Sequence, residues 1–209
     1  ELQRHQVSLF DSRRVRCLIT SGDTTPDNFR SKTLEIQGIV RNAADAGIEL
    51  VQIREKLLPA RLLTDLVTNC VAAVARSRTR VLVNERFDIA LVAGAHGVQL
   101  TSTSIPVEYV RTHVGNEFLI GVSTHSAREV GAARIGGADF ALFGPIFLTP
   151  GKGPPAGLSS LNEVCTNVAP FPVIAVGGID ESNYESVLAA GAAGFASIRY
   201  LIEFAKISE

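Results

Sequence analysis

The stretch from Leu119 to Gly157, LIGVSTHSAREVGAARIGGADFALFGPIFLTPGKGPPAG, indicates the fold most directly. A strand-length apolar run ends at His125, a helical pattern follows, and a second apolar run breaks at Gly144 into a loop that carries Lys152. Two parallel strands cannot be joined by a tight turn, so this order predicts a parallel pair with a right-handed crossover. Because both strands then end at one edge of the sheet, we expect His125, the Gly144 turn and the Lys152 loop to face one another.

The same alternation of strand-like and helical patterns repeats along the chain. Strands are predicted at 15–20, 49–54, 80–84, 97–100, 118–123, 139–143, 171–176 and 194–198, and helices at 28–46, 61–75, 87–93, 106–114, 181–190 and up to 207, with one more after His125. Eight such units predict an α/β fold, a closed (β/α)₈ TIM barrel forming a single domain over 14–209 after an N-terminal tail at 1–13. An open doubly wound sheet is the alternative, but no Gly-x-Gly-x-x-Gly follows the first strand.

Composition limits the class of protein and its partners. The chain has 209 residues, of which 46% are hydrophobic and 20% charged, and its net charge of −1 argues against nucleic acid as a partner. No apolar run approaches the roughly 18 residues that a membrane span needs, so we expect a cytoplasmic protein without a membrane partner. Three widely spaced cysteines, Cys17, Cys70 and Cys165, suit reduced, buried thiols. A short barrel often buries a face against its own copy, which leaves a homodimer open.

Polar and glycine residues gather where the predicted strands end, which is where barrel enzymes place their sites. They are Gln52, Arg54 and Lys56; Asn84 and Glu85; Gln99; Ser123 and His125; Gly144, Thr149 and Lys152; Gly177 and Gly178; and Ser197, which the apolar Ile198 follows.

Two of these side chains suggest chemistry on an anion. Arg54 at the barrel interior needs an anionic partner, either a structural carboxylate or a substrate carboxylate or phosphate, and Lys56 beside it favours the ligand. His125 is either a satisfied polar residue or a general acid/base, and we favour proton transfer because histidine titrates nearest neutral pH. The other histidines, His5, His96 and His113, are expected to be structural.

Gly177 and Gly178 predict a phosphate site. Glycines allow backbone N–H groups to approach an anion closely, and a helix beginning near Ser197 would direct its positive end toward it. The alternative is a plain glycine turn between strand and helix. A second turn that begins with glycine, at 191–194, favours the phosphate site over the plain turn.

Five motifs in order resemble one known family. They are Gln52-Ile53-Arg54-Glu55-Lys56, Val83 to Ala90 (VNERFDIA), Gly121 to His125 (GVSTH), Phe143 to Phe147 (FGPIF) with Thr149 and Lys152, and Val176 to Ile179 (VGGI). Together they resemble the thiamine phosphate synthase family, which includes the TenI-type thiazole tautomerases.

The resemblance implies a (β/α)₈ barrel of thiamine biosynthesis that binds a thiazole phosphate. In the synthase branch it implies a second substrate, hydroxymethylpyrimidine pyrophosphate, and Mg²⁺. Matching positions would bind the pyrimidine pyrophosphate through Gln52, Arg54, Lys56 and Asn84, neutralise the leaving group with Lys152, and bind the thiazole phosphate at Gly177 and Gly178. Substrate contacts are also assigned to Gln99, Ser123 and Thr149, and phosphate contacts to Gly144, Ser197 and Ile198. In the tautomerase branch His125 would move the proton.

The departures from the synthase pattern decide the expectation between the branches. The family usually places two Mg²⁺-binding aspartates after the third and fourth strands, whereas this sequence has Glu85 and Ser104 there. Losing one carboxylate should weaken a magnesium site, so Glu85 is the sole metal-ligand candidate. We therefore expect a TenI-like thiazole tautomerase acting through His125. A thiamine-phosphate synthase is the first alternative, since Lys56 and Lys152 are synthase-like, and a non-catalytic barrel that binds thiamine-pathway phosphates is the second.

Overall fold

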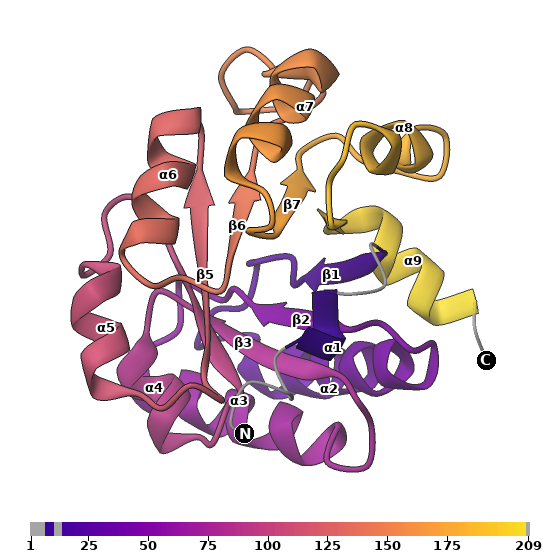
Figure 1. Ribbon diagram of the computed structural model, residues 1–209. Coiled ribbons are helices and arrows are strands. Elements are labelled where there is room, and N and C mark those ends of the chain that lie inside the picture. Colours follow the sequence, from indigo (N-terminus) through magenta and orange to yellow (C-terminus); the bar gives the residue numbers. More distant parts are fainter. Residues whose placement is uncertain (1–6, 11–13, 208–209) are drawn as a thin grey trace. The chain divides into compact units, whose positions relative to one another are not determined.

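A computed structural model describes residues 7–10 and 14–207 of the chain (Figure 1). Its eight strands are joined as a closed barrel in the order β1-β2-β3-β4-β5-β6-β7-β8, with helices alternating between them. The predicted (β/α)₈ barrel is therefore confirmed, and the open doubly wound sheet is excluded.

The strands are short, and every strand pair with an assigned register is parallel. They are β1 (Val15–Ile19), β2 (Leu50–Ile53), β3 (Arg80–Asn84), β4 (Gly97–Leu100), β5 (Leu119–Thr124), β6 (Phe140–Phe143), β7 (Val173–Val176) and β8 (Gly194–Ser197). The helices are α1 (Val7–Phe10), α2 (Phe29–Asp45), α3 (Ala60–Ala73), α4 (Phe87–Val92), α5 (Val107–His113), α6 (Ala127–Ile135), α7 (Gly157–Val168), α8 (Tyr184–Ala189) and α9 (Arg199–Ile207).

Contacts between residues are concentrated within two parts of the chain. Cys17–Gln99 with 198–207 forms one part, which we call the first half, and Leu100–Ser197 with 7–10 and 14–16 forms the other, the second half. The first half carries most of β1, then β2 and β3 and most of β4, together with α2, α3, α4 and α9. The second half carries β5 to β8 and the helices between them.

In the first half the core comes from strands that are buried on both faces. Val51, Ile53, Val81 and Val83 are all fully buried, and β2 pairs with β3 so that Gln52 lies opposite Leu82. Parallel strands covered by helices have this continuous apolar character. The stripe of α3 that begins at Leu63 packs inward, and each fully buried Leu contributes about 1.5–3 kcal/mol.

In the second half an ion pair supports the strands from outside the predicted site. Arg111 on α5 donates to the Asp139 carboxylate at 2.6 Å, and the same carboxylate accepts the N–H of Ile120 at the start of β5. Burial raises the pKa of Asp139 above its usual value despite the neighbouring cation. Asp139, which directly precedes β6, therefore connects β5 with α5.

The predicted boundaries are close to those observed. The strands at 80–84 and 97–100 have the predicted bounds, and the others differ by one or two residues. Strand β7 begins later than expected because Pro172 has no N–H to donate to a ladder. Helix α8 begins at Tyr184, since Asp180 and Asn183 first form a turn in which the Asp180 N–H donates to the Asn183 side chain.

Other predictions have mixed outcomes. The bounds of α7 were not predicted from the sequence. Helix α1 lies within the predicted tail, and the tail's remaining residues, 1–6 with His5 and 11–13, lie outside the described residues. Cys17 and Cys70 are buried free thiols whose pKa burial raises to about 12, whereas Cys165 is only half-buried. In the described part of the chain, no helix combines the length and apolarity that a membrane span requires.

Candidate active site

The end of β2 in the first half presents the predicted Gln52, Arg54 and Lys56. Gln52 is 2% exposed, and its carbonyl accepts the N–H of Thr20 at 3.0 Å, while the Thr20 hydroxyl accepts the N–H of Arg54 at 2.9 Å. Arg54 is half-buried and Lys56 is exposed. Within residues 7–10 and 14–207, no carboxylate forms an ion pair with Arg54. A half-buried guanidinium without such a partner is available to an anionic ligand.

Lys56 converges with the residues that end β3. The Lys56 ammonium lies 2.8 Å from Oε2 of Glu85, and the Asn84 side-chain amide donates to the same oxygen at 2.8 Å. A cavity of about 390 Å³ adjoins these three polar residues and is also lined by the apolar Ile53 and Leu58. The predicted cation, amide and carboxylate are thus brought together beside a space large enough for a small ligand.

Glu85 is held in an unusual backbone conformation. Its φ of 62° lies in the left-handed region, and it is the single non-glycine residue with positive φ in the described part of the chain. Such a conformation costs about 1–3 kcal/mol and is frequent at functional sites. It directs Glu85 toward Lys56 at the end of the strand.

The described residues contain no cluster of three metal-binding side chains. Mg²⁺ is commonly bound by one or two carboxylates together with substrate phosphates, and Glu85 fits the part of a single protein ligand. Its Oε2 already contacts a cation and an amide, so any magnesium site here would need the substrate's oxygens. When bound, the metal would neutralise negative charge on those oxygens.

Hydroxyl groups stabilise the turn that follows β4. Gln99 is fully buried, and its backbone carbonyl accepts the N–H of Glu85 at 2.9 Å. In the turn that follows, the Ser104 hydroxyl accepts the N–H of Thr101 at 2.9 Å. Ser104, which stands where the family usually has a second metal-binding aspartate, therefore stabilises a turn.

His125 begins the candidate site of the second half. Its Nδ1 lies 2.6 Å from the carbonyl oxygen of Gly144, and because a carbonyl only accepts, Nδ1 carries the proton. The backbone N–H of His125 donates to the Glu129 carboxylate at 2.8 Å, while the Ser126 side chain caps α6 by accepting the Glu129 N–H. The Gly144 carbonyl and the capped start of α6 hold the ring of His125, and Nε2 is the remaining polar atom of the ring. The neighbouring Ser123 is half-buried and has interactions of its own.

Gly144 and the loop after β6 meet the turn after β7. The Gly144 N–H donates to Thr124, and a Cβ on Gly144 would collide with the carbonyl of Val176. In the loop the Thr149 hydroxyl donates to the Phe147 carbonyl at 2.9 Å. Lys152 is exposed and forms no ion pair with the described residues. His125 thus contacts the Gly144 turn, as predicted, while the Lys152 side chain lies in solvent.

Gly177 and Gly178 form a tight turn with free donors. Their φ angles are 101° and 66°, and added Cβ atoms would lie 2.6 Å from the Cβ of Pro145 and 2.8 Å from that of Phe147. Neither N–H forms a hydrogen bond with a described residue. Ser197, at the end of β8, donates its hydroxyl to the carbonyl of Ile179 at 3.0 Å. Adjacent N–H groups of this kind suit an anion, and the phosphate site at Gly177 and Gly178 stays a prediction.

Ile198 belongs to the first half. It is 36% exposed and precedes α9, and its carbonyl accepts the N–H of Ile202. Its predicted phosphate contact, like the other residue roles, stays a prediction.

Sequence reasoning missed two polar residues that support the site of the first half, Thr20 and Glu55. Both are 2% exposed, and both hold the segment around Arg54. For Glu55 the sequence did offer a signal, because this charged residue lies between two predicted ligand residues in Arg54-Glu55-Lys56.

Comparisons with known proteins agree with one another. The family described as thiamine monophosphate synthase matches residues 23–201. A protein of Geobacter sulfurreducens, provisionally named a thiamine-phosphate synthase, is 41% identical over 179 residues, which are 84% of each chain. The thiamine-phosphate synthase of Gloeobacter violaceus is 39% identical over 170 residues, covering 80% of this chain and 50% of that protein. A solved structure of thiamine phosphate pyrophosphorylase from Pyrococcus furiosus has a TM-score of 0.77 at 27% identity and 93% coverage of both chains.

A closed (β/α)₈ barrel with polar groups at the strand ends defines the class, a barrel enzyme acting on small molecules. The chain belongs to the thiamine monophosphate synthase family, whose enzymes serve thiamine biosynthesis. The family resemblance found in the five motifs is thereby confirmed.

Proposed function

We propose that this chain is a thiamine-phosphate synthase that joins hydroxymethylpyrimidine pyrophosphate to a thiazole phosphate. The thiazole nitrogen forms a bond to the methylene carbon of the pyrimidine, the carbon–oxygen bond to pyrophosphate breaks, and pyrophosphate leaves with the electron pair. The relatives carry the synthase name, which favours this function over the tautomerase expected from Ser104 and the β4 turn.

The observation that carries the proposal is the meeting of Lys56, Asn84 and Glu85 beside the cavity. A pyrophosphate brings several negative charges, and Lys56 together with Arg54, which forms no ion pair with any described residue, supplies two cations on one strand end. A tautomerase that handles no pyrophosphate would have no use for Lys56. In the proposed function the first half binds the pyrimidine pyrophosphate, with Glu85 as the protein ligand of any Mg²⁺.

The second half would bind the thiazole phosphate. The N–H groups of Gly177 and Gly178, which bond to no residue that the structure describes, offer two donors to its phosphate oxygens, and the Ser197 hydroxyl bonds to Ile179 next to them. Lys152 would neutralise charge on the leaving pyrophosphate. Each of these roles uses a backbone or ammonium donor and requires no proton transfer.

A tautomerase remains the second candidate because of one observation in the second half. Gly144 fixes the proton of His125 on Nδ1, which leaves Nε2 to take or give a proton on a thiazole ring. This arrangement is what acid/base catalysis needs.

Product analysis separates the two functions. The protein is incubated with hydroxymethylpyrimidine pyrophosphate, thiazole phosphate and Mg²⁺, and thiamine phosphate and released pyrophosphate are quantified together. Equal amounts of the two products support the synthase. If neither forms while the thiazole carboxylate phosphate is isomerised, the synthase proposal is wrong and the tautomerase takes its place.

A further inference from the structure

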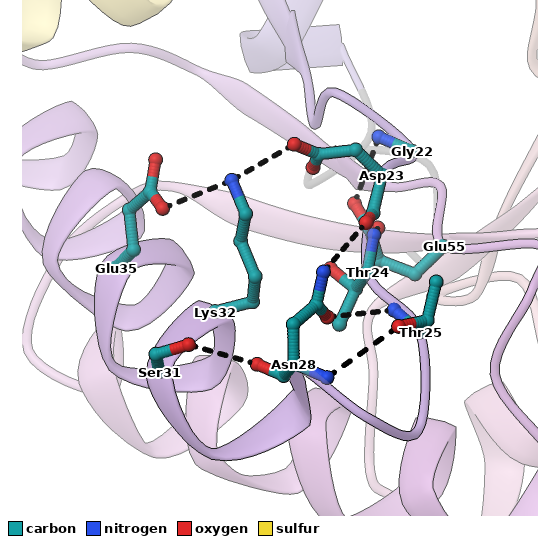
Figure 2. A network of polar contacts seen from close by, with 9 residues as sticks. All are labelled: Gly22, Asp23, Thr24, Thr25, Asn28, Ser31, Lys32, Glu35 and Glu55. Carbon is teal, nitrogen blue, oxygen red and sulfur yellow. Dashed lines mark hydrogen bonds and ion pairs between the residues drawn. The ribbon is translucent and has the colours of Figure 1, made fainter.

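Glu55 is a buried carboxylate that the proposed reaction does not use. It directly follows Arg54 and is 2% exposed. Its two carboxylate oxygens accept backbone N–H groups of the loop between β1 and α2, Oε1 from Gly22 at 3.2 Å and Oε2 from Thr24 at 3.0 Å (Figure 2). Burying a carboxylate is costly unless such donors replace water. The carboxylate therefore fixes the loop at two points.

The loop fixed in this way lies against Arg54. Gly22 has a φ of 80°, and a Cβ built on it would lie 3.0 Å from Nη1 of Arg54 and 3.0 Å from the Arg54 carbonyl oxygen. On the backbone side the Thr20 hydroxyl accepts the Arg54 N–H at 2.9 Å. The loop thus approaches the guanidinium of Arg54 so closely that a Cβ on Gly22 would touch it, and Thr20, directly after β1, bonds to the Arg54 backbone.

The outer part of the same loop is anchored to α2, as Figure 2 shows. Asn28 accepts the N–H of Thr25 at 2.8 Å and donates its side-chain amide to the Asp23 carbonyl at 3.1 Å. Lys32 bridges the carboxylates of Asp23 and Glu35 at 2.8 and 3.1 Å. The bond from Thr24 to Glu55 is buried and the bond from Gly22 to Glu55 is partly buried, whereas none of these outer contacts is fully buried, so Glu55 is the inner anchor.

We infer that Glu55 is a positioning residue that holds the Gly22–Thr24 loop against Arg54 and so orients the guanidinium for an anionic substrate. The inference rests on the proposed function, since it assigns Arg54 to the pyrophosphate substrate. A guanidinium that is already ordered loses less rotamer freedom on binding. Loosening the loop should therefore weaken substrate binding while leaving the chemical step nearly unchanged.

The first test replaces Glu55→Gln, which keeps the size of the side chain but turns one acceptor oxygen into a donor. We expect the KM for the pyrimidine pyrophosphate to rise roughly tenfold, as for loss of one charge-assisted hydrogen bond. The kcat should stay within about threefold, because no group touching the reacting atoms has changed. The KM for the thiazole phosphate should not change. An unaltered KM for the pyrophosphate substrate would overturn the inference.

A double-mutant cycle separates positioning from general destabilisation. In an Arg54→Ala background, Glu55→Gln should raise the same KM by less than about twofold, since the side chain it orients is gone. If the factors by which the two substitutions raise KM simply multiply in the double variant, Glu55 does not act through Arg54. The matched control is Glu35→Gln, which removes an exposed carboxylate from the outer part of the loop network and should leave both kinetic constants unchanged.

Gly22→Ala keeps Glu55 and provides the second variant, should Glu55→Gln not fold. Its methyl group would press on the Arg54 guanidinium, and we expect the same selective rise in KM. Calorimetric titration with inorganic pyrophosphate reports binding without turnover. If the wild-type protein neither binds pyrophosphate nor forms thiamine phosphate, the proposed function fails and the inference with it. If the wild type does both and the Glu55 and Gly22 variants equal it, the inference alone fails.

Discussion

In the first half of the chain the candidate anion site is built from side chains, whereas in the second half it is built from backbone. Lys56 and Glu85 form an ion pair that a ligand can rearrange by moving side chains. Gly177 and Gly178 present N–H groups fixed by a turn that leaves no room for a Cβ. A substitution in a site built from side chains should lower ligand affinity with little change in the free energy of unfolding. A substitution in a site built from backbone should lower both.

The largest expected effect comes from Gly177→Ala. Its φ of 101° disfavours any Cβ, and the added methyl group would lie 2.6 Å from the Cβ of Pro145. We expect the free energy of unfolding to fall by about 3 kcal/mol from strain and overpacking together. Thiazole phosphate binding should weaken as the turn shifts. Urea unfolding and calorimetric titration measure the two effects.

Gly151→Ala is the matched control for that variant. Gly151 also has a positive φ, of 72°, but a Cβ there meets nothing within 4 Å. It should therefore lose only the conformational part of the stability. Equal losses in the two variants would show that the close contact with Pro145 contributes nothing, and would contradict a rigid backbone site.

Lys56→Met tests the side-chain site and should have the next largest effect. Met keeps most of the apolar stem and removes the charge. We expect the affinity for pyrophosphate to fall roughly tenfold, but the free energy of unfolding to change by less than about 1 kcal/mol, because a pair this exposed contributes little. Titration calorimetry and urea unfolding again provide the two measurements.

Lys206→Met removes the same charge from an exposed position on α9 and controls for net charge. It should leave pyrophosphate affinity unchanged. An equal loss of affinity in both lysine variants would mean that Lys56 acts only through the overall field, without a specific role at the end of β2.

The same contrast explains what could be predicted from the sequence. Apolar runs of strand length alternating with helical stripes determined the barrel, since burial on both faces requires such runs at β2 and β3. The side-chain site could also be predicted, because the sequence places Gln52, Arg54 and Lys56 at the end of one strand and Asn84 and Glu85 at the end of the next. The positive φ of Glu85 could not be predicted, because it depends on the tertiary contacts of the loop.

Support for the predicted residues was the part that sequence reasoning could not supply. Glu55 bonds to backbone N–H groups more than thirty positions earlier in the chain, and no local pattern encodes such a contact. The bond from His125 to the Gly144 carbonyl likewise follows from the register of β5 with β6. The strand-end residues were therefore predictable, but their orientation was not.

His125→Asn distinguishes the two candidate functions and should have a smaller effect on the proposed one. The Asn amide can still donate to the Gly144 carbonyl, but it cannot exchange a proton with a substrate. Because the synthase reaction uses no acid/base group there, we expect thiamine phosphate formation to stay within about threefold of wild type. Steady-state kinetics with both substrates measures this.

A fall of about a hundredfold or more would instead assign His125 to the chemistry. His125→Ala serves as the companion variant, since it also removes the hydrogen bond to Gly144. If Ala lowers the rate and Asn does not, the histidine acts by holding the turn.

The smallest expected effect concerns His96, which uses its ring in the opposite way from His125. Its Nδ1 accepts the N–H of Val81 at 3.0 Å, so Nδ1 carries no proton. Burial, together with the charge of Arg80, lowers the pKa of His96 below 6.5 in the folded protein. The unfolded chain therefore takes up a proton first, and the stability that neutral His96 contributes is present above about pH 6.5 and lost as the pH falls below it.

His96→Gln should remove this pH dependence, because the Gln side-chain oxygen can accept the Val81 N–H and does not titrate between pH 7.5 and 5. Urea unfolding of wild type and variant at both ends of that range gives the comparison. We expect the wild type to lose more stability on acidification than the variant. His113→Gln, at an exposed position where His113 stacks on Tyr109, should behave like wild type. An equal loss in wild type and His96→Gln would show that His96 contributes nothing to the pH dependence in this range, and the contrast between a half-buried acceptor histidine and a donor histidine at the site would fail.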